Sequence, residues 1–269
     1  MKKMRLILGL CLILLINQVY SQETLTTNAQ TAINTLGTDN PFAFYDLNLS
    51  DSEIKTLEKI SINSLTLKDY NNYGNIDKLE VEANEFIKLL SKDNEIIAKE
   101  VSQLITKLVK GLVQASGKET AWVTLRASIP SSEFDLPRWH TDGYYYQPFN
   151  NQRKFALVLK GPSTLFCKLS PSQKNAFDTL KTQENPKIEF KNGKIIKFEE
   201  DMSNRQALAT MIRDSQVPIM VAKPYQGSVF VVGESNAAIH SEPSISENRL
   251  FLSILPGSKS QIEEWKSKQ

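Results

Sequence analysis

The sequence predicts a mainly β domain with helices, of the α+β class, preceded by a helical N-terminal region. Three observations lead to this expectation. Helical periodicity dominates before Gly117, short strand-like segments separated by turn residues follow it, and two helices with a hairpin interrupt those strands. Short strands spaced in this way are typical of a sandwich or barrel. The 269 residues suffice for one domain with an appendage or for two small domains.

Residues 1–21 have the three-part layout of a secretory signal peptide. Basic residues open the chain, and an apolar run from Leu6 to Ile16 follows that is too short to span a bilayer comfortably. We expect cleavage near Ser21, export to the periplasm or the exterior, and no stable membrane span in the mature protein. An uncleaved amphipathic or anchor helix is the alternative.

Charge and cysteine content exclude two classes of function. The formal net charge of +2 falls to −1 once residues 1–21, with three basic and no acidic residues, are removed. No basic excess then remains to attract nucleic acid. The mature chain keeps one cysteine, Cys167, which excludes an internal disulfide and a cysteine-rich zinc site. Because Cys167 lies in an apolar stretch, we expect it to be buried.

The predicted helical N-terminal region covers residues 22–116. Its first part, residues 22–49, has weak periodicity and reads as a partly ordered lead-in. Ser50 and Glu53 then form a capping box that opens a short helix through Ile60.

A longer amphipathic pattern runs from Asp77 to Ser116. Its apolar residues recur at three- and four-residue steps, with an interruption near Asp93 and a plausible stop at Gly117. The apolar stripe packs against the downstream domain or, alternatively, lies on a membrane or a partner.

The predicted β domain covers residues 117–257, and residues 258–269 form a C-terminal helix or tail. Its expected strands are Ala121–Ile129, Lys154–Leu159, Thr164–Leu169, Pro218–Ala222, Ser228–Val232 and Arg249–Leu255. A hairpin over Lys187–Glu199, turning at Asn192–Gly193, is flanked by helices Ser172–Thr182 and Ser203–Asp214.

The chain has only two histidines, and both fall into one pattern. His140 and Asp142 are two residues apart, so in an extended segment both side chains project from the same side. His240 follows a strand about 100 residues later. Two imidazoles and one carboxylate on one face leave coordination positions open, an arrangement that suits non-haem iron(II). We predict a metal site made of these three residues.

Arg249 stands nine residues after His240, at the start of a strongly apolar strand. Bidentate pairing with a carboxylate is the commonest reason to hold a guanidinium in such a place. That carboxylate can belong to a co-substrate.

At this point the sequence resembles the iron(II)/2-oxoglutarate-dependent dioxygenases, which are built on a double-stranded β-helix, and in particular a largely uncharacterised bacterial branch. The likeness covers roughly Trp122 to Pro256. It rests on these segments: Trp139–Asp142, Lys154–Lys160, Gly161–Thr164, Gly227–Gly233, Ala238–Pro243 and Arg249–Leu252.

The resemblance implies a fold, a reaction and roles for residues. The implied fold is a double-stranded β-helix of the jelly-roll or cupin-like kind. The implied activity is that of an oxidoreductase of hydroxylase type, which uses Fe(II) and 2-oxoglutarate on a small-molecule or protein substrate. His140, Asp142 and His240 would be the catalytic iron ligands, and Arg249 would bind the distal carboxylate of 2-oxoglutarate. One departure is Phe251, where many members have a hydroxyl residue, and Thr164 or a nearby tyrosine could substitute.

Two interpretations are possible for several neighbouring residues. The aromatic run from Tyr144 to Phe149 either borders the pocket mouth or is ordinary packing, and Trp139 reads as core. Glu242 either orients His240 or, more simply, is a solvated carboxylate.

Three other functions stay open. The chain can be a non-catalytic metal- or ligand-binding module on the same fold, or a zinc- or manganese-dependent cupin-like enzyme. A Ser–His–Asp hydrolase fits poorly, because no Gly-x-Ser-x-Gly motif is present.

Overall fold

The computed structural model describes residues 22–62, 69–91, 94–191 and 194–269. The expected signal peptide, the predicted helix interruption at Asp93 and the hairpin turn at Asn192–Gly193 lie outside these residues. Within them, no helix has both the length and the apolar character needed to cross a membrane.

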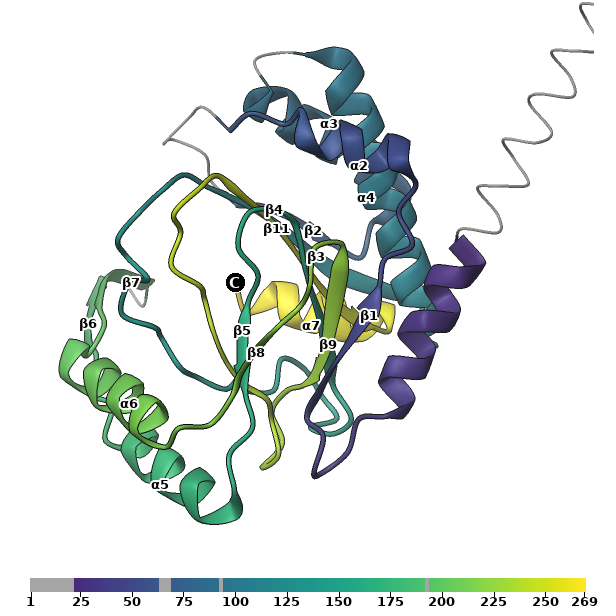
Figure 1. The fold of residues 1–269 in the computed structure, drawn as a ribbon. Helices are drawn as coiled ribbons and strands as arrows, with labels where there is room; N and C mark the ends of the chain where they lie inside the picture. The colour runs from purple at the N-terminus through teal and green to yellow at the C-terminus, as the bar shows by residue number, and fades with distance from the viewer. Residues whose placement is uncertain (1–21, 63–68, 92–93, 192–193) are drawn as a thin grey trace, which may run out of the picture.

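Two antiparallel sheets form the centre of the molecule (Figure 1). The larger has six strands in the spatial order β1 (Phe42–Asp46), β9 (Gln226–Val231), β4 (Arg153–Lys160), β11 (Arg249–Gly257), β3 (Thr120–Ser128) and β2 (Tyr70–Tyr73). The smaller contains β10 (Ile239–Ser241), β5 (Leu165–Cys167) and β8 (Ile219–Val221). Residue His140 extends this small sheet through an antiparallel bridge to His240.

The path of the chain between the sheets defines the fold. From β3 it crosses to the small sheet at His140, returns in β4, crosses again to β5 and β8, returns in β9, crosses to β10 and ends in β11. Facing side chains such as Phe166 from β5 and Phe230 from β9 pack between the sheets. This alternation is that of a double-stranded β-helix, so the predicted fold is confirmed.

Strand β11 shows why the central strands read as nearly continuous apolar runs. Its residues alternate between the two faces of the large sheet. Leu250, Leu252 and Ile254 belong to the core shared with the helices, whereas Arg249, Phe251 and Ser253 line the cavity between the sheets. Because both faces are covered, polarity does not alternate along the strand in the usual way.

Three helices cover the outer face of the large sheet: α2 (Asp51–Glu58), α3 (Ile76–Leu90) and α4 (Glu95–Ala115). The predicted capping box at Ser50 and Glu53 is present. Gly117, just past α4, adopts a φ of 64°, which glycine reaches without steric strain.

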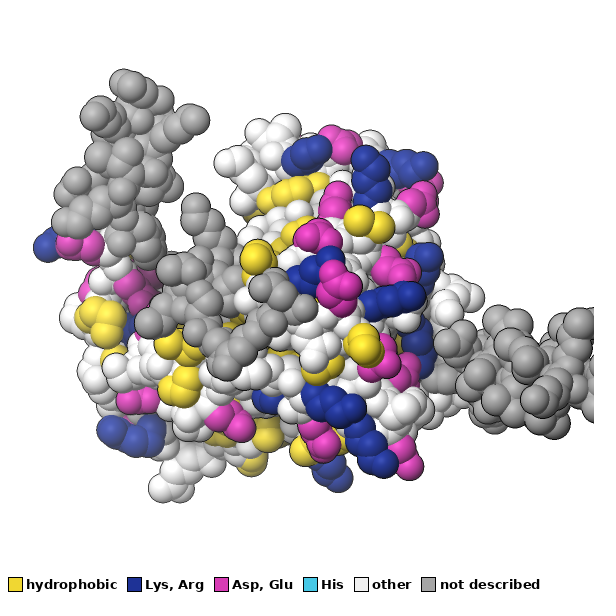
Figure 2. Space-filling model, turned by 90° about the horizontal axis from the view of Figure 1, so that it is seen from above, with side chains coloured by type: hydrophobic (Ala, Val, Ile, Leu, Met, Phe, Trp, Pro, Cys, Tyr) yellow, Lys and Arg dark blue, Asp and Glu magenta, His cyan; other side chains and the backbone are white. Residues whose placement is uncertain are grey.

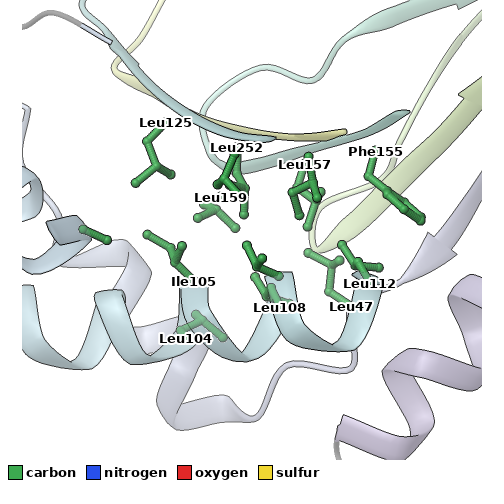
Figure 3. Packing of buried hydrophobic residues seen from close by; sticks show 14 of the residues in the cluster. Leu47, Leu104, Ile105, Leu108, Leu112, Leu125, Phe155, Leu157, Leu159 and Leu252 are labelled. Carbon is green, nitrogen blue, oxygen red and sulfur yellow. The ribbon is translucent and has the colours of Figure 1, made fainter. Parts of the chain in front are cut away.

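The apolar stripe of α4 packs on the sheet. Ile105, Leu108 and Leu112 point towards sheet residues such as Leu157 and Leu252 (Figure 3). Burial of each such leucine contributes about 1.5–3 kcal/mol. Charges of both signs are interspersed on the side of the molecule where these helices lie (Figure 2). The stripe therefore serves the packing role predicted for it.

An insertion between β5 and β8 projects from the small sheet (Figure 1). It consists of α5 (Pro171–Thr182), β6 (Lys187–Lys191), β7 (Lys194–Glu199) and α6 (Met202–Asp214). Phe177 and Leu208 from its helices share a cluster with Trp139 and Cys167. Trp139 and Cys167 are both buried, as predicted.

The N-terminal region differs from expectation in two ways. Residues 22–49 are not a partly ordered lead-in, because residues 22–34 form a helix and β1 follows. The region of residues 22–116 is also not only helical, since β1 and β2 form the two edges of the large sheet. Of the two alternatives expected for residues 258–269, a helix or a tail, the structure has the helix, α7 (Lys259–Ser267).

Candidate metal centre

His140, Asp142 and His240 meet between the two sheets. One ligand atom from each lies within 4.8 Å of the others. The two histidine backbones exchange N–H···O hydrogen bonds of 2.9 Å in each direction, and their ring centroids are 4.3 Å apart. The structure thus brings together the three residues that the sequence pattern singled out.

Main-chain carbonyls set the orientation of both imidazoles. His140 Nδ1 lies 2.8 Å from the carbonyl oxygen of Arg138, and His240 Nδ1 lies 3.1 Å from that of Ala238. A carbonyl only accepts, so the Nδ1 atoms carry the protons and both Nε2 lone pairs remain for a cation. These nitrogens lie 3.7 and 3.8 Å from Asp142 Oδ1.

Burial keeps the two imidazoles neutral. It lowers the pKa of His140 to about 4, with the charge of His240 adding to the effect. It also lowers the pKa of His240. Neutral imidazole is the form that binds metals.

Lys154, which the sequence analysis missed, holds the other oxygen of Asp142. Its Nζ donates to Asp142 Oδ2 at 2.8 Å and to the Tyr145 hydroxyl at 2.9 Å. Burial alone would raise the pKa of Asp142, but the charge of Lys154 outweighs it and holds this pKa far below its usual range. Asp142 is therefore a carboxylate that offers Oδ1 to a cation. The available signal was the position of Lys154 at the start of an apolar strand.

Arg249 is 3% exposed and lines the same cavity as the metal cluster. Its Nε donates to the Pro162 carbonyl at 2.9 Å and its Nη2 to the Thr164 hydroxyl at 3.4 Å. Within the described part of the chain it has no carboxylate partner. Burial lowers the pKa of Arg249 to about 10, so it stays charged at neutral pH.

The structure brings Arg249 and Thr164 together, and Phe251 stacks on the guanidinium instead of supplying a hydroxyl. The Phe251 ring lies under the guanidinium, 4.6 Å from its central carbon to the ring centroid, a favourable cation–π geometry.

Glu242 corrects one expectation. It is neither a solvated carboxylate nor the group that orients His240. Its carboxylate accepts from Arg138 Nη2 at 2.6 Å, and the side chain is 17% exposed. Burial raises the pKa of Glu242, but the hydrogen bond from Arg138 outweighs this and lowers it to about 2.

The aromatic run after Asp142 is mainly packing. Tyr144 contacts the Phe149 ring, and Tyr146 is buried and donates its hydroxyl proton to the Pro256 carbonyl. Tyr145 alone reaches the metal cluster, through Lys154.

A cavity of about 400 Å³ contains the metal cluster and Arg249. One wall comes from β4, β9 and β11, and β2 and β3 extend it outward. The cluster therefore has room beside it for a small molecule.

No family model matches the chain, and no curated protein matches it. Solved structures do resemble it at low identity. A prolyl-4-hydroxylase from Pseudomonas putida has 10% identity and a TM-score of 0.39, with 86% of this chain and 92% of that chain covered.

Two other solved structures are similar to the same degree. The Kdo hydroxylase KdoO, a non-haem Fe(II) α-ketoglutarate-dependent dioxygenase in complex with cobalt(II), has 14% identity and a TM-score of 0.41, covering 90% and 91% of the two chains. Asparagine oxygenase in complex with Fe(II), 3-hydroxyasparagine and succinate has 8% identity and a TM-score of 0.42, covering 88% and 80%.

Proposed function

We propose that the protein is an exported, non-haem iron(II)/2-oxoglutarate-dependent oxygenase of hydroxylase type. One observation carries the proposal: two Nε2 atoms and one carboxylate oxygen converge in a cavity that also contains a buried arginine, which has no carboxylate partner among the described residues. Two imidazoles and a carboxylate suit iron(II) and leave positions for a co-substrate and oxygen. The arginine suits a carboxylate at the far end of that co-substrate.

The residues fit these groups chemically. Bound iron(II) would supply the oxygen-activating chemistry, with 2-oxoglutarate as the source of electrons. His140 and His240 present unprotonated Nε2 atoms, and Asp142 presents Oδ1 because Lys154 engages Oδ2. Arg249 with Thr164 offers donors to a carboxylate.

Aromatic side chains flank the site. Phe230 lies beside His240, with ring centroids 4.9 Å apart, and Phe251 lies under Arg249. These rings place apolar surface beside the metal cluster and beside the arginine, and charge interactions are stronger next to such surface than in bulk water.

An anaerobic titration tests the proposal. Iron(II) added to the apoprotein, followed by 2-oxoglutarate, should produce a weak visible charge-transfer band, and admission of oxygen should release succinate. His140→Ala should abolish metal binding. If metal binds but neither band nor succinate appears, the chain is instead a metal- or ligand-binding module on the same fold.

Metal identity has its own measurement. Protein purified without chelator should contain iron, and zinc or manganese in its place would favour the cupin-like alternative. Metal content that is unchanged by His140→Ala would show that the triad is wrong.

Export rests on residues 1–21 alone. Iron(II) and 2-oxoglutarate are chiefly intracellular, so export requires delivery into another cell or into a reducing lumen. N-terminal sequencing of the protein from cell fractions tests this: we expect a start at Gln22 in the exported fraction. A chain that keeps Met1 and stays inside the cell would refute it.

A further inference from the structure

The outer wall of the cavity is built by β2 and β3, beyond the metal cluster. Its side chains are Asp69, Asn71 and Tyr73 from the β2 side and Trp122, Thr124 and Arg126 from β3, with Arg138 and Glu242 also lining it. We call this set the outer wall. None of these residues belongs to the metal cluster, and none hydrogen-bonds to Arg249 or Thr164 in the described part of the chain, so the proposed chemistry leaves the outer wall without a role.

Both arginines of the outer wall are bound along one edge only. Arg126 uses Nε and Nη2 to hold Asp69, at 2.6 to 3.0 Å. Arg138 uses the same two atoms to hold Glu242, at 2.6 and 3.3 Å. In the described part of the chain, Nη1 of each arginine makes no hydrogen bond. Two guanidinium groups therefore keep free donors on the cavity wall, each held in place by its own carboxylate.

Asn71 adds a third donor. Its Oδ1 accepts from Trp122 Nε1 at 2.9 Å and from the Thr124 hydroxyl at 2.8 Å. These two bonds fix which end of the amide is oxygen, because an indole N–H only donates. Its Nδ2 makes no hydrogen bond to the residues that the structure describes. The hydrogen-bonding groups of the outer wall that have no partner among the described residues are thus mainly N–H donors.

Charged side chains of both signs line the cavity. Four cationic and three anionic side chains line it: Arg126, Arg138, Lys154 and Arg249 against Asp69, Asp142 and Glu242. Gln269, the last residue of the sequence, lines the same cavity and carries a terminal carboxylate. The case for an anion therefore rests on the free N–H donors and not on the net charge.

We propose that the outer wall binds the carboxylate of the substrate, through Arg126 Nη1, Arg138 Nη1 and the Asn71 amide, so that the enzyme acts on a small anionic molecule. This rests on the proposed function, and it assigns β2 a role in substrate recognition. Guanidinium and amide N–H groups in fixed positions are well matched to a carboxylate. The arginines are 45% and 40% exposed, so the substrate reaches them from the open end of the cavity.

Calorimetry with matched probes tests the assignment. The protein is loaded with zinc(II), saturated with 2-oxoglutarate and tagged at its N-terminal end, because Gln269 lines the cavity. Loading is itself measured first, so failure of the proposed function is seen separately. The probes are pairs that differ in one group: gluconate and glucose, N-acetyl-alanine and its amide. We expect the carboxylate of at least one pair to bind about tenfold more tightly than its neutral partner.

Asn71→Asp is the sharpest variant. It keeps the oxygen that accepts from Trp122 and Thr124 but replaces the free amide with a negative charge. Carboxylate binding should fall at least about tenfold, while affinity for 2-oxoglutarate and thermal stability stay unchanged. Arg126→Gln and Arg138→Gln, which keep a donor for their acidic partners, should each weaken carboxylate binding similarly.

Arg153→Gln is the matched control, since Arg153 pairs with Glu234 at 3.4 Å and does not line the cavity. It should bind every probe as the unchanged protein does. Three results would each overturn the assignment. The neutral partners bind as tightly as the carboxylates or more tightly, no carboxylate binds at millimolar concentration, or the Asn71→Asp protein behaves like the control.

Discussion

Replacement of Lys154 by methionine should weaken the apoprotein and strengthen metal binding. The Lys154 ammonium and the Asp142 carboxylate are 2.8 Å apart, with side chains 16% and 13% exposed. At an effective dielectric constant of about 20, their attraction is about 6 kcal/mol. Desolvation of both groups cancels part of this. Removal of one partner leaves a buried charge unpaired, and such changes cost about 3–5 kcal/mol.

Metal binding reverses part of that cost. A divalent ion at Asp142 Oδ1 neutralises the carboxylate that Lys154→Met leaves unpaired, and the variant no longer carries a cation beside the ion. We therefore expect zinc(II) to bind the variant at least about tenfold more tightly, a gain of about 1.4 kcal/mol. Urea unfolding with and without zinc(II) measures stability, and calorimetry measures affinity.

The comparison with Asp142→Ala decides the interpretation. Asp142→Ala should lose metal affinity, whereas Lys154→Met should gain it while losing apoprotein stability. If Lys154→Met has unchanged stability, or loses metal affinity as Asp142→Ala does, the charge reasoning is refuted and Lys154 acts by holding Asp142 in position.

Three further predictions concern separate parts of the chain. Arg249→Gln should weaken 2-oxoglutarate binding by about 2–5 kcal/mol and leave zinc(II) affinity nearly unchanged, both measured by calorimetry. An equal loss of 2-oxoglutarate and zinc(II) affinity would contradict a role of Arg249 in carboxylate binding. Burial raises the pKa of the Cys167 thiol to about 12, so a thiol reagent should modify it only after denaturant is added, and rapid labelling of the native protein would refute its burial. Burial raises the pKa of Glu53, but hydrogen bonds from Lys107 and Ser50 outweigh it and lower this pKa below 4.5. The stabilisation of the folded state by the Glu53 carboxylate is therefore complete above about pH 4.5, and it is lost as the pH falls through the lowered pKa. Glu53→Gln should therefore reduce the dependence of the free energy of unfolding on pH in the acid range. An unchanged pH dependence would refute the pairing of Glu53 with Lys107.

The metal cluster could be predicted because its signal is local and chemical. With only two histidines in the chain, a His-x-Asp pair and a later histidine form a short list of possible ligands. Only His240 lies in a strand, β10, whereas His140 and Asp142 lie in the irregular segment between β3 and β4. Arg249 was noticeable because a guanidinium begins a strongly apolar strand.

Strand β2 gave no such signal. Asn71 faces a polar cavity, and the strand lies at the edge of the sheet, so its sequence Tyr-Asn-Asn-Tyr lacks the apolar alternation of a half-buried strand. The pairs Arg126–Asp69 and Arg138–Glu242 join residues 57 and 104 positions apart. Pairing over such separations depends on the fold and cannot be read from spacing.

The helix over residues 22–34 was missed for a related reason. Its threonines have low intrinsic helix propensity. In the structure, the hydroxyls of Thr26, Thr27 and Thr31 donate to the carbonyl four residues earlier, which satisfies them inside the helix. Leu25 and Ala29 are fully buried in the core. Tertiary packing therefore overrides a weak local preference.

The backbone bridge between His140 and His240 has a consequence for the mechanics of the barrel. These residues are about 100 positions apart, and the whole α5–α6 insertion lies between them. An ion bound by both would act as a crosslink across that span, and closing a loop of this length by a crosslink removes about 4.7 kcal/mol of chain entropy from the unfolded state. In a chain with a single described cysteine, the ion would act as the crosslink that a disulfide forms in other proteins. Its loss would remove this constraint from the small sheet, and protease resistance would then follow the metal content.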